Sequence, residues 1–182
     1  MVPLNFTPFP TLTTERIVLR QMTNEDDKDI FILRADPSVS EFISRAICTS
    51  IDDARQFINK INTGIGKNEW AYWGIALKEN NRIIGTACLW NFAHQHSRGE
   101  IGYELLPDFQ GKGLGQEAVA AVIDYGFKNL ELHSMEAVVY PANTPSIKLL
   151  EKNGFVREAY FKENNFFNGK YIDTAIYSRL NS

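Results

Sequence analysis

Cysteine is scarce in this sequence of 182 residues, and no long hydrophobic run interrupts it. The two cysteines, Cys48 and Cys88, stand far apart, so they indicate neither a disulfide framework nor a cysteine-rich metal site. Nowhere do about 18 apolar residues follow one another, and the N-terminal stretch lacks a basic segment followed by an apolar one. We therefore expect no membrane span, no secretory leader and a cytoplasmic location.

A strong charge of one sign is also missing, because 22 acidic residues stand against 19 basic ones and leave a net charge of -3. Proteins that bind nucleic acids or anionic membranes usually carry a basic excess, so we expect neither partner. Hydrophobic residues make up 44% and charged residues 23% of the sequence, which is typical of a soluble globular protein with one well-buried core. The prolines of residues 1–11 predict an extended lead-in, followed by a single domain over residues 12–182.

Hydrophobic periodicity predicts a mixed α/β protein of the α+β kind. Thr23–Asp26 and Ser50–Asp53 are typical helix starts, Pro37 is expected to end the first helix, and Thr144 is expected to cap the last. Strands are predicted over residues 16–21, 70–77, 82–90, 99–106, 135–140, 155–167 and 170–178. The pattern indicates a mixed, mostly antiparallel central sheet flanked by about four helices, with a C-terminal β-hairpin that turns at Asn168-Gly169.

Three glycines in five residues, Gly111, Gly113 and Gly115, lie between a predicted strand and a predicted helix. Glycine takes positive φ without strain, and the free N–H groups of a helix N-terminus attract phosphate. The stretch from Gln110 to Gly115 is therefore either a pyrophosphate loop or a turn without a ligand. A dinucleotide fingerprint would need glycine where Gln116 stands, and a Walker loop is absent because Gly113 follows Lys112.

Six stretches together resemble the GNAT superfamily of N-acyltransferases, and within it the RimJ/RimL branch of ribosomal-protein N-terminal acetyltransferases. They stand in the family's order and cover about residues 12–180. They are Leu12–Arg16, Ile101–Pro107, Gln110–Gly115, Asn143–Ser146, Leu149–Phe155 and Asn168–Asp173. The resemblance implies a GNAT domain that binds acetyl-CoA, transfers its acetyl group to an amine and releases CoA.

The resemblance also implies which residues hold acetyl-CoA. Backbone N–H groups of the glycine stretch would bind the pyrophosphate, and Lys112 would add a positive charge unless it is only a surface lysine. The pantetheine arm would lie along the strand that ends at Leu106, where Leu105 or Leu106 would offer an N–H group to the developing oxyanion. The expected cofactor-binding residues are Leu105, Leu106, Gln110, Gly111, Lys112, Gly113, Leu114, Gly115, Asn143 and Ser146.

Transfer to an amine needs a base for the nitrogen and an acid for the departing thiolate. Glu104 is the predicted base, with Glu100 in reserve, because strand alternation puts both carboxylates on one face. The alternative is that both only line a solvated face. The resemblance assigns the acid to Ser146, with Tyr140 in reserve. Alternatively, Asn143 and Ser146 serve only as helix-entry residues.

The predicted acceptor is the α-amino group of a protein N-terminus, as in the ribosomal-protein branch. Similar sequences act on polyamines, antibiotics and other small amines, so a small-molecule acceptor stays open, and so does a domain that binds acyl-CoA without turnover. Gln116 disfavours a nucleotide-binding oxidoreductase. His94 and His96 beside Glu100 lack a clear third ligand, and we assign no metal. A monomer and a homodimer remain equally open.

Overall fold

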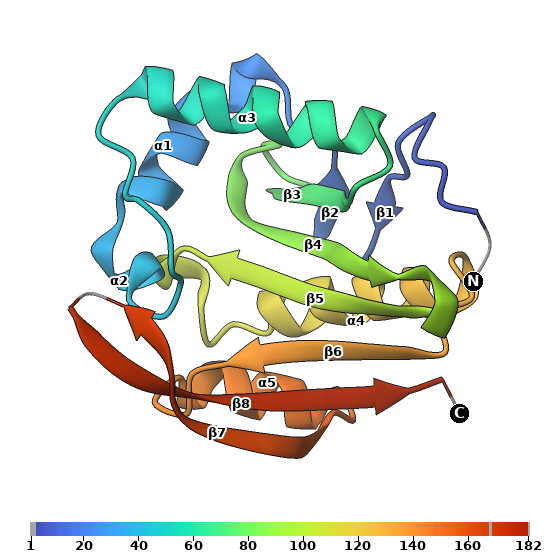
Figure 1. The fold of residues 1–182 in the computed structure, drawn as a ribbon. Coiled ribbons are helices and arrows are strands. Elements are labelled where there is room, and N and C mark those ends of the chain that lie inside the picture. The colour runs from blue at the N-terminus through green and yellow to red at the C-terminus, as the bar shows by residue number, and fades with distance from the viewer. Residues whose placement is uncertain (1–2, 168, 182) are drawn as a thin grey trace.

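The computed structural model describes residues 3–167 and 169–181, which form one eight-stranded sheet with helices on both faces (Figure 1). The strand order is β1-β2-β3-β4-β5-β6-β8-β7, and among the described strand pairs only β5 and β6 are parallel. This confirms the mixed, mostly antiparallel sheet with a C-terminal hairpin. The strands are β1 (Leu12–Thr13), β2 (Ile17–Arg20), β3 (Ala71–Leu77), β4 (Ile83–Ala93), β5 (Arg98–Leu105), β6 (Ser134–Val139), β7 (Val156–Phe167) and β8 (Lys170–Leu180).

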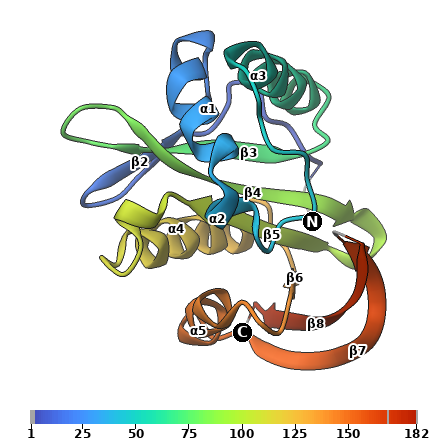
Figure 2. The same ribbon diagram turned by 90° about the vertical axis from the view of Figure 1, so that its left-hand side faces the viewer.

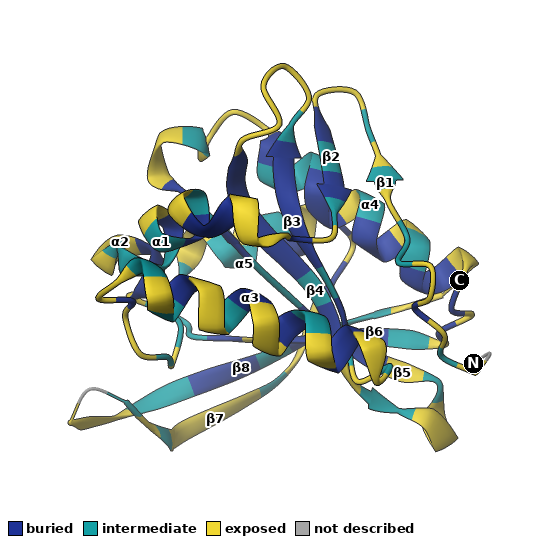
Figure 3. Cartoon of the chain, turned by 90° about the horizontal axis from the view of Figure 1, so that it is seen from above, coloured by how far each residue is buried: buried dark blue, intermediate teal, exposed yellow. Residues whose placement is uncertain are grey.

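The described ranges contain five α-helices and three short 3-10 helices. They are α1 (Asp27–Ala35), α2 (Pro37–Ser40), α3 (Ile51–Gly66), α4 (Leu114–Lys128), α5 (Thr144–Lys152), η1 (Asn24–Asp26), η2 (His94–His96) and η3 (Pro107–Phe109). In Figures 2 and 3, α1 and α3 cover one face of the sheet and α4 covers the other. Among the described residues, no helix is long and apolar enough to cross a membrane.

Helix α3 shows how the sequence pattern builds a layer. Its buried side chains, among them Ala54, Ile58 and Ile61, recur at helical spacing and lie on one face, while the other face is exposed (Figure 3). At its start, Ser50 accepts the N–H of Asp53 and the Asp53 carboxylate accepts the N–H of Ser50. This reciprocal pair satisfies N–H groups that the helix itself leaves free, and it confirms the predicted start.

The N-terminal lead-in is bound more closely than the sequence predicted. Residues 3–11 form no helix or strand, but Phe6 is only 1% exposed and its N–H donates to Asn68 at 2.8 Å. The indole N–H of Trp73 donates to the Pro10 carbonyl at 2.8 Å. The prolines prevent regular structure there, yet the segment still covers part of the core beside β3.

Pro37 and the last hairpin are two places where the sequence predicted a turn. Pro37 does follow the end of α1, but it also begins α2, because Asp36 caps that short helix by accepting the N–H of Ser38 at 2.8 Å. The predicted turn of the last hairpin involves Asn168, which lies outside the described residues. Its neighbour Gly169 has a φ of +79°, in the left-handed region that favours glycine.

Strands β5 and β6 part soon after they start, and this split prepares the functional site. Their described ladder pairs Arg98–Glu100 with Ser134–Glu136 and goes no further, and Figure 1 shows the two strands diverging. On the other side of β5, the Leu106 N–H donates to the Ile84 carbonyl at 2.9 Å. Because antiparallel pairing alternates along a strand, the N–H of Leu105 points away from β4 and toward the split.

Candidate active site

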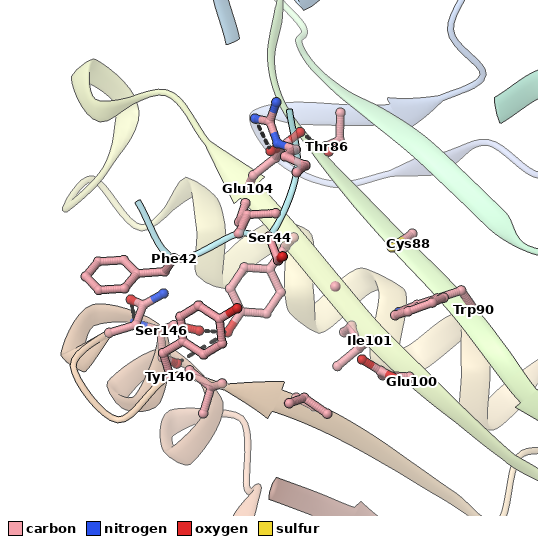
Figure 4. Close-up of a pocket in the computed structure, with 18 of the residues that line it drawn as sticks. Phe42, Ser44, Thr86, Cys88, Trp90, Glu100, Ile101, Glu104, Tyr140 and Ser146 are labelled. Atoms are coloured by element: carbon pink, nitrogen blue, oxygen red, sulfur yellow. Dashed lines mark hydrogen bonds and ion pairs between the residues drawn. The ribbon is translucent and has the colours of Figure 1, made fainter. Parts of the chain in front are cut away.

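The residues expected to be catalytic meet around one cavity beside the split (Figure 4). It measures about 390 Å³ and is lined by Glu100 and Glu104 of β5, by Tyr140 after β6, and by Asn143 and Ser146 at the start of α5. Figure 4 shows Ser146 and Tyr140 together across the pocket from Glu104, with Glu100 farther along the same strand. The split sheet thus brings together groups that are distant in sequence.

Glu104 is buried rather than on a solvated face, and both of its carboxylate oxygens are bound. Arg45 Nη2 lies 2.8 Å from Oε2, Arg34 Nη1 lies 3.9 Å from Oε1, and the Thr86 hydroxyl donates to Oε1 at 3.1 Å. The Glu104 side chain is only 5% exposed. Thr86 also bonds the Tyr72 hydroxyl at 3.1 Å. Burial raises the pKa of Tyr72, and the Glu104 charge adds to the rise, so this phenol keeps its proton.

Glu100 is half-buried and differs from Glu104 in its surroundings. Asn91 donates to its Oε2 at 3.2 Å. Burial raises the pKa of Glu100, the Asn91 hydrogen bond opposes the rise, and the nearby Glu136 carboxylate adds to it. A raised pKa brings a carboxyl closer to the range in which a general base works at neutral pH. Within the described residues, no group of three His, Cys, Asp or Glu side chains is placed to hold a metal ion.

The hydroxyl of Ser146 is held by a residue that the sequence did not single out. Tyr103 Oη and Ser146 Oγ are 2.8 Å apart. Asn143, and not Thr144 as predicted, caps α5, because its Oδ1 accepts the Ser146 N–H at 3.2 Å and Thr144 is already helical. Asn143 therefore does serve as a helix-entry residue. Burial raises the pKa of Tyr103 to about 12, the Ser146 hydrogen bond opposing the rise, so Tyr103 is protonated at neutral pH.

Tyr140, the reserve acid, also reaches the cavity. Its hydroxyl accepts a hydrogen bond from Asn165 at 3.0 Å, and its ring packs against Phe167 at a centroid distance of 6.1 Å. Burial raises its pKa, and the Asn165 bond partly offsets the rise. Hence Tyr140 and Ser146 both offer a protonated oxygen to the pocket.

The glycine stretch forms a loop that ends at the start of α4. Gly111 and Gly113 have φ of +69° and +81°, which other residues rarely adopt. Gly115 does not use this freedom, because it already lies within the helix and its φ is not positive. No side chain of the described residues caps α4, so its first N–H groups are available to an anion. The exposed Lys112 adds a charge, with Nζ 5.8 Å from the Phe109 ring centroid.

The loop is tied to the N-terminal strands by contacts that sequence reasoning missed. Arg16 Nη1 donates to the Lys112 carbonyl at 2.9 Å, and Arg16 Nε lies 2.8 Å from Glu117 Oε2. The Thr14 hydroxyl and the Arg16 N–H both donate to Glu117 Oε1. Partial burial raises the pKa of Glu117, but these hydrogen bonds outweigh it and lower the pKa. The carboxylate therefore fixes the loop as long as it is charged.

The main chain of β5 fits an extended ligand laid against the split. The Leu105 N–H faces the split, whereas the Leu105 carbonyl already accepts the Gln110 side chain at 2.9 Å. The Leu106 N–H is bound to Ile84, which excludes that group as the oxyanion donor. An unpaired strand edge, positive-φ glycines and a helix start without a capping side chain together match what a phosphorylated, extended acyl carrier needs.

Comparison with known proteins decides the family. The model of the acetyltransferase (GNAT) domain matches residues 16–156. The chain belongs to the GNAT acetyltransferase family. It is 39% identical over 171 residues to the N-acetyltransferase p20 of Bacillus licheniformis, covering 93% of this chain and 96% of that protein. Over 170 residues it is 34% identical to the N-acetyltransferase YoaA of Bacillus subtilis, with the same two coverages.

Solved structures agree with this assignment. A GNAT-family acetyltransferase from Bacillus anthracis has a TM-score of 0.85 and 29% identity, covering 94% of this chain and 99% of that one. The ribosomal-protein-S5-alanine acetyltransferase of Vibrio fischeri has a TM-score of 0.84 and 26% identity, covering 95% and 97%. The spermidine N-acetyltransferase of Vibrio cholerae was solved with CoA and spermine. It has a TM-score of 0.79 and 25% identity, covering 91% of this chain and 95% of that one. The predictions of a GNAT enzyme with acetyl-CoA as its donor are confirmed.

Arg34, Arg45 and Tyr103 are among the pocket residues that sequence reasoning did not find. Each occupies a place where the pattern gives no special signal: an arginine in the last turn of α1, an arginine in the loop before α3, and a tyrosine in a strand. Arg34 and Arg45 acquire meaning only beside Glu104, which stands 70 and 59 positions away. Tyr103 stands directly before Glu104 on β5, and strand alternation puts neighbouring side chains on opposite faces, so the pattern gave no hint that Tyr103 reaches the pocket.

Proposed function

We propose that this acetyltransferase modifies the α-amino group of a protein N-terminus in the cytoplasm, with residues 12–182 as its catalytic domain. Two buried or half-buried carboxylates and a serine hydroxyl line one cavity at the open edge of β5, and this observation carries the proposal. A peptide N-terminus is an extended chain that can enter such a cleft end-on. The ribosomal-protein acetyltransferase among the similar structures supports the same acceptor class.

The proposed cofactor site follows the split. Main-chain N–H groups of Gly111, Gly113 and the start of α4 would hold the pyrophosphate, with Gln110 and Lys112 beside them. The pantetheine arm would run along β5 between Leu105 and Asn143. Bound there, acetyl-CoA supplies the thioester whose carbonyl carbon the amine attacks. The Leu105 N–H would then face the carbonyl oxygen as negative charge develops on it.

In the proposed reaction, Glu104 accepts the proton that the amine loses as its nitrogen bonds to the acetyl carbon, directly or through a water. The carbon–sulfur bond breaks, and Ser146 donates a proton to the sulfur. Solvent then returns a proton to Ser146 and takes the one that Glu104 accepted. Glu100 is the alternative base, and its raised pKa supports that role. Tyr140 is the alternative acid. In this scheme Arg34 and Arg45 keep the Glu104 carboxylate in place.

Glu104→Gln and Glu100→Gln test the base. If Glu104 is the base, Glu104→Gln lowers kcat by about 100-fold while the acetyl-CoA Kd changes little, because proton removal is lost but the residues proposed to hold acetyl-CoA are unchanged. Glu100→Gln changes kcat far less. Release of CoA thiol measures turnover, and mass spectrometry of a peptide library identifies acetylated N-termini. Unchanged turnover in Glu104→Gln together with a loss in Glu100→Gln would move the role to Glu100.

A small amine is the second candidate acceptor. A spermidine N-acetyltransferase of Vibrio cholerae is 27% identical in sequence over 87% of this chain. A similar solved structure, also of a spermidine N-acetyltransferase, contains CoA and spermine. The same thiol-release assay, run with spermidine, separates the two acceptors. Binding of acetyl-CoA without turnover of any amine would instead indicate a domain that only binds the acyl carrier.

A further inference from the structure

Two partly buried arginines line the acceptor end of the cavity, and Glu104 is the carboxylate that both of them contact. The side chains of Arg34 and Arg45 are 13% and 10% exposed, and both lie against Glu104. The other acid of the pocket, Glu100, stands four residues away on β5, about 13 Å along the strand. Its described polar partner is Asn91, and the charges that act on it are those of Glu136 and Arg98. The cluster of Arg34, Arg45 and Glu104 therefore has two positive charges and one negative charge, a net charge of one positive unit.

The two guanidinium groups also hold more donors than they use. Each has five N–H donors. Arg45 gives two hydrogen bonds, to Glu104 and to the Arg34 carbonyl at 3.2 Å, and the 3.9 Å between Arg34 and Glu104 exceeds hydrogen-bond length. Within the described part of the chain, the Nε atoms of both arginines are buried without a hydrogen-bond partner. An incoming group cannot reach those two buried atoms, but Arg34 also gives no hydrogen bond from its Nη groups within the described residues and lines the cavity. Its unused Nη donors therefore point to an acceptor that arrives with the substrate.

Both arginines are held in place before any substrate binds. The Arg34 guanidinium stacks on the Phe57 ring at 3.7 Å from its centroid, and Arg45 is attached to the Arg34 main chain. A fixed, planar guanidinium suits a carboxylate better than a flexible ammonium does, because it donates two parallel hydrogen bonds. By the same reasoning, a polycationic acceptor would meet an unfavourable charge.

We infer that the acceptor carries a carboxylate next to its reactive amine: the preferred substrate is a peptide N-terminus with an acidic residue among its first two. This inference rests on the proposed function and names the substrate class of the same site. Arg34 is a specificity-determining residue in this scheme, and Arg45 supports both Glu104 and the incoming carboxylate.

Matched peptides test the inference. They begin Ser-Asp, Ser-Asn or Ser-Lys and are otherwise identical, so that Asp and Asn differ in charge but hardly in shape. The expected kcat/KM is at least about tenfold higher for Asp than for Asn, the effect of one charge-assisted contact. The Lys peptide and spermidine rank below Asn. A peptide with Asp moved to position five behaves like the Asn peptide.

Arg34→Gln is expected to bring the Asp-to-Asn ratio to within about twofold, and Arg34→Lys to restore part of it, because the charge returns without the planar fork. The matched control is Arg157→Gln, an exposed arginine on β7, which leaves the ratio unchanged. A preference for the Lys peptide or spermidine in the unaltered enzyme overturns the inference and leaves amine acetylation standing. If the Asp-to-Asn ratio of kcat/KM stays at its original value in Arg34→Gln, Arg34 does not determine the preference for an acidic residue.

Peptide binding to the CoA-bound protein, measured by calorimetry, separates this inference from the proposed function. If no amine is turned over but the Asp peptide still binds at least about tenfold more tightly than the Asn peptide, the acidic subsite stands and the proposed catalysis fails. If neither peptide binds preferentially, the subsite is absent whatever the enzyme acetylates.

Discussion

At the scale of single residues, the contact between the Tyr103 and Ser146 hydroxyls indicates what each residue does. Ser146 alone is an ordinary residue in the first turn of a helix. A protonated phenol 2.8 Å from its hydroxyl makes that hydroxyl a fixed group that faces the cavity. Tyr103 acts through Ser146, so we treat it as a positioning residue and Ser146 as the group that protonates sulfur.

The sizes of the kcat losses in Ser146→Ala, Tyr103→Phe and Tyr140→Phe test this assignment. Ser146→Ala is expected to lower kcat by about 100-fold, because it removes the proton donor. Tyr103→Phe is expected to lower kcat by about tenfold with little change in the KM for acetyl-CoA, because the donor remains but is less well oriented. The measurement is kcat and KM from thiol release at several pH values.

Tyr125→Phe on α4, a tyrosine outside the cavity lining, is the matched control and should leave kcat unchanged. Tyr140→Phe should have a small effect. An unaltered rate in Ser146→Ala, combined with lost activity in Tyr140→Phe, would reverse the two roles.

At the scale of elements, the site depends on how β4 and β5 approach each other. Gly85 of β4 lies opposite Leu105 of β5. A Cβ at Gly85 would lie 2.3 Å from the Glu104 carbonyl oxygen and 3.1 Å from the Leu105 Cα. Main-chain atoms cannot move aside as a flexible side chain can, so the strand that carries Glu104 would have to shift.

Gly85→Ala is expected to reduce the free energy of unfolding by about 1–3 kcal/mol, the usual cost of overpacking, and to reduce kcat as well because Glu104 and Leu105 move. Chemical unfolding and thiol release measure the two effects. Gly66→Ala is the control, because its Cβ would meet nothing within 4 Å and alanine favours the helix. Equal unfolding free energies and equal kcat values for Gly85→Ala and Gly66→Ala would contradict this account of Gly85.

Glu117 links two elements, and its charge gives the link a pH dependence. The pKa of Glu117 is lowered from its ordinary 4.5, since its hydrogen bonds from Arg16 and Thr14 outweigh the opposing effect of burial. The charged form is therefore favoured by folding. Its contribution to stability is complete above about pH 4.5 and is lost as the pH falls through the lowered value in the folded state.

Glu117→Gln is thus expected to cost about 1–3 kcal/mol of unfolding free energy at pH 7, and the difference from the unaltered protein should shrink below about pH 4. Urea unfolding between pH 3 and 7 measures this. Glu131→Gln, an exposed acid beyond α4, is the control. A difference that is constant with pH would show that the Glu117 charge is not what matters.

At the scale of the whole molecule, the split sheet divides the chain into two parts that share one ligand site. The part through α4 contributes the glycine loop and the edge of β5, and the part from β6 onward contributes Asn143 and Ser146. A ligand laid along the split contacts both parts, so its binding free energy adds to the stability of the whole fold.

Acetyl-CoA at 100 times its Kd is therefore expected to stabilise the protein by about 2.7 kcal/mol, and NADP at the same concentration to have no effect. Thermal unfolding with increasing ligand measures the shift. Gly113→Ala should reduce the acetyl-CoA effect, because its φ of +81° strains any other residue and its Cβ would lie 3.2 Å from Arg16 Nη2. Stabilisation by NADP instead of acetyl-CoA would contradict the proposed site.

Local patterns determined most of the fold. Apolar spacing marked the strands and the long helices, Ser50 and Asp53 marked the start of α3, and glycines at 111 and 113 marked the loop before α4. These features depend on neighbours within a few positions, so the sequence displays them directly. The order of motifs was enough to identify the family.

Only the tertiary structure decided how those elements form a site. The parting of β5 from β6 at Glu100, the burial of Glu104 between two arginines and the contact of Tyr103 with Ser146 all join residues far apart in the chain. Such contacts depend on packing, and no local periodicity encodes them. The sequence alone therefore determined the fold and the donor of the reaction, whereas the charge of the acceptor pocket became visible only once the chain was folded.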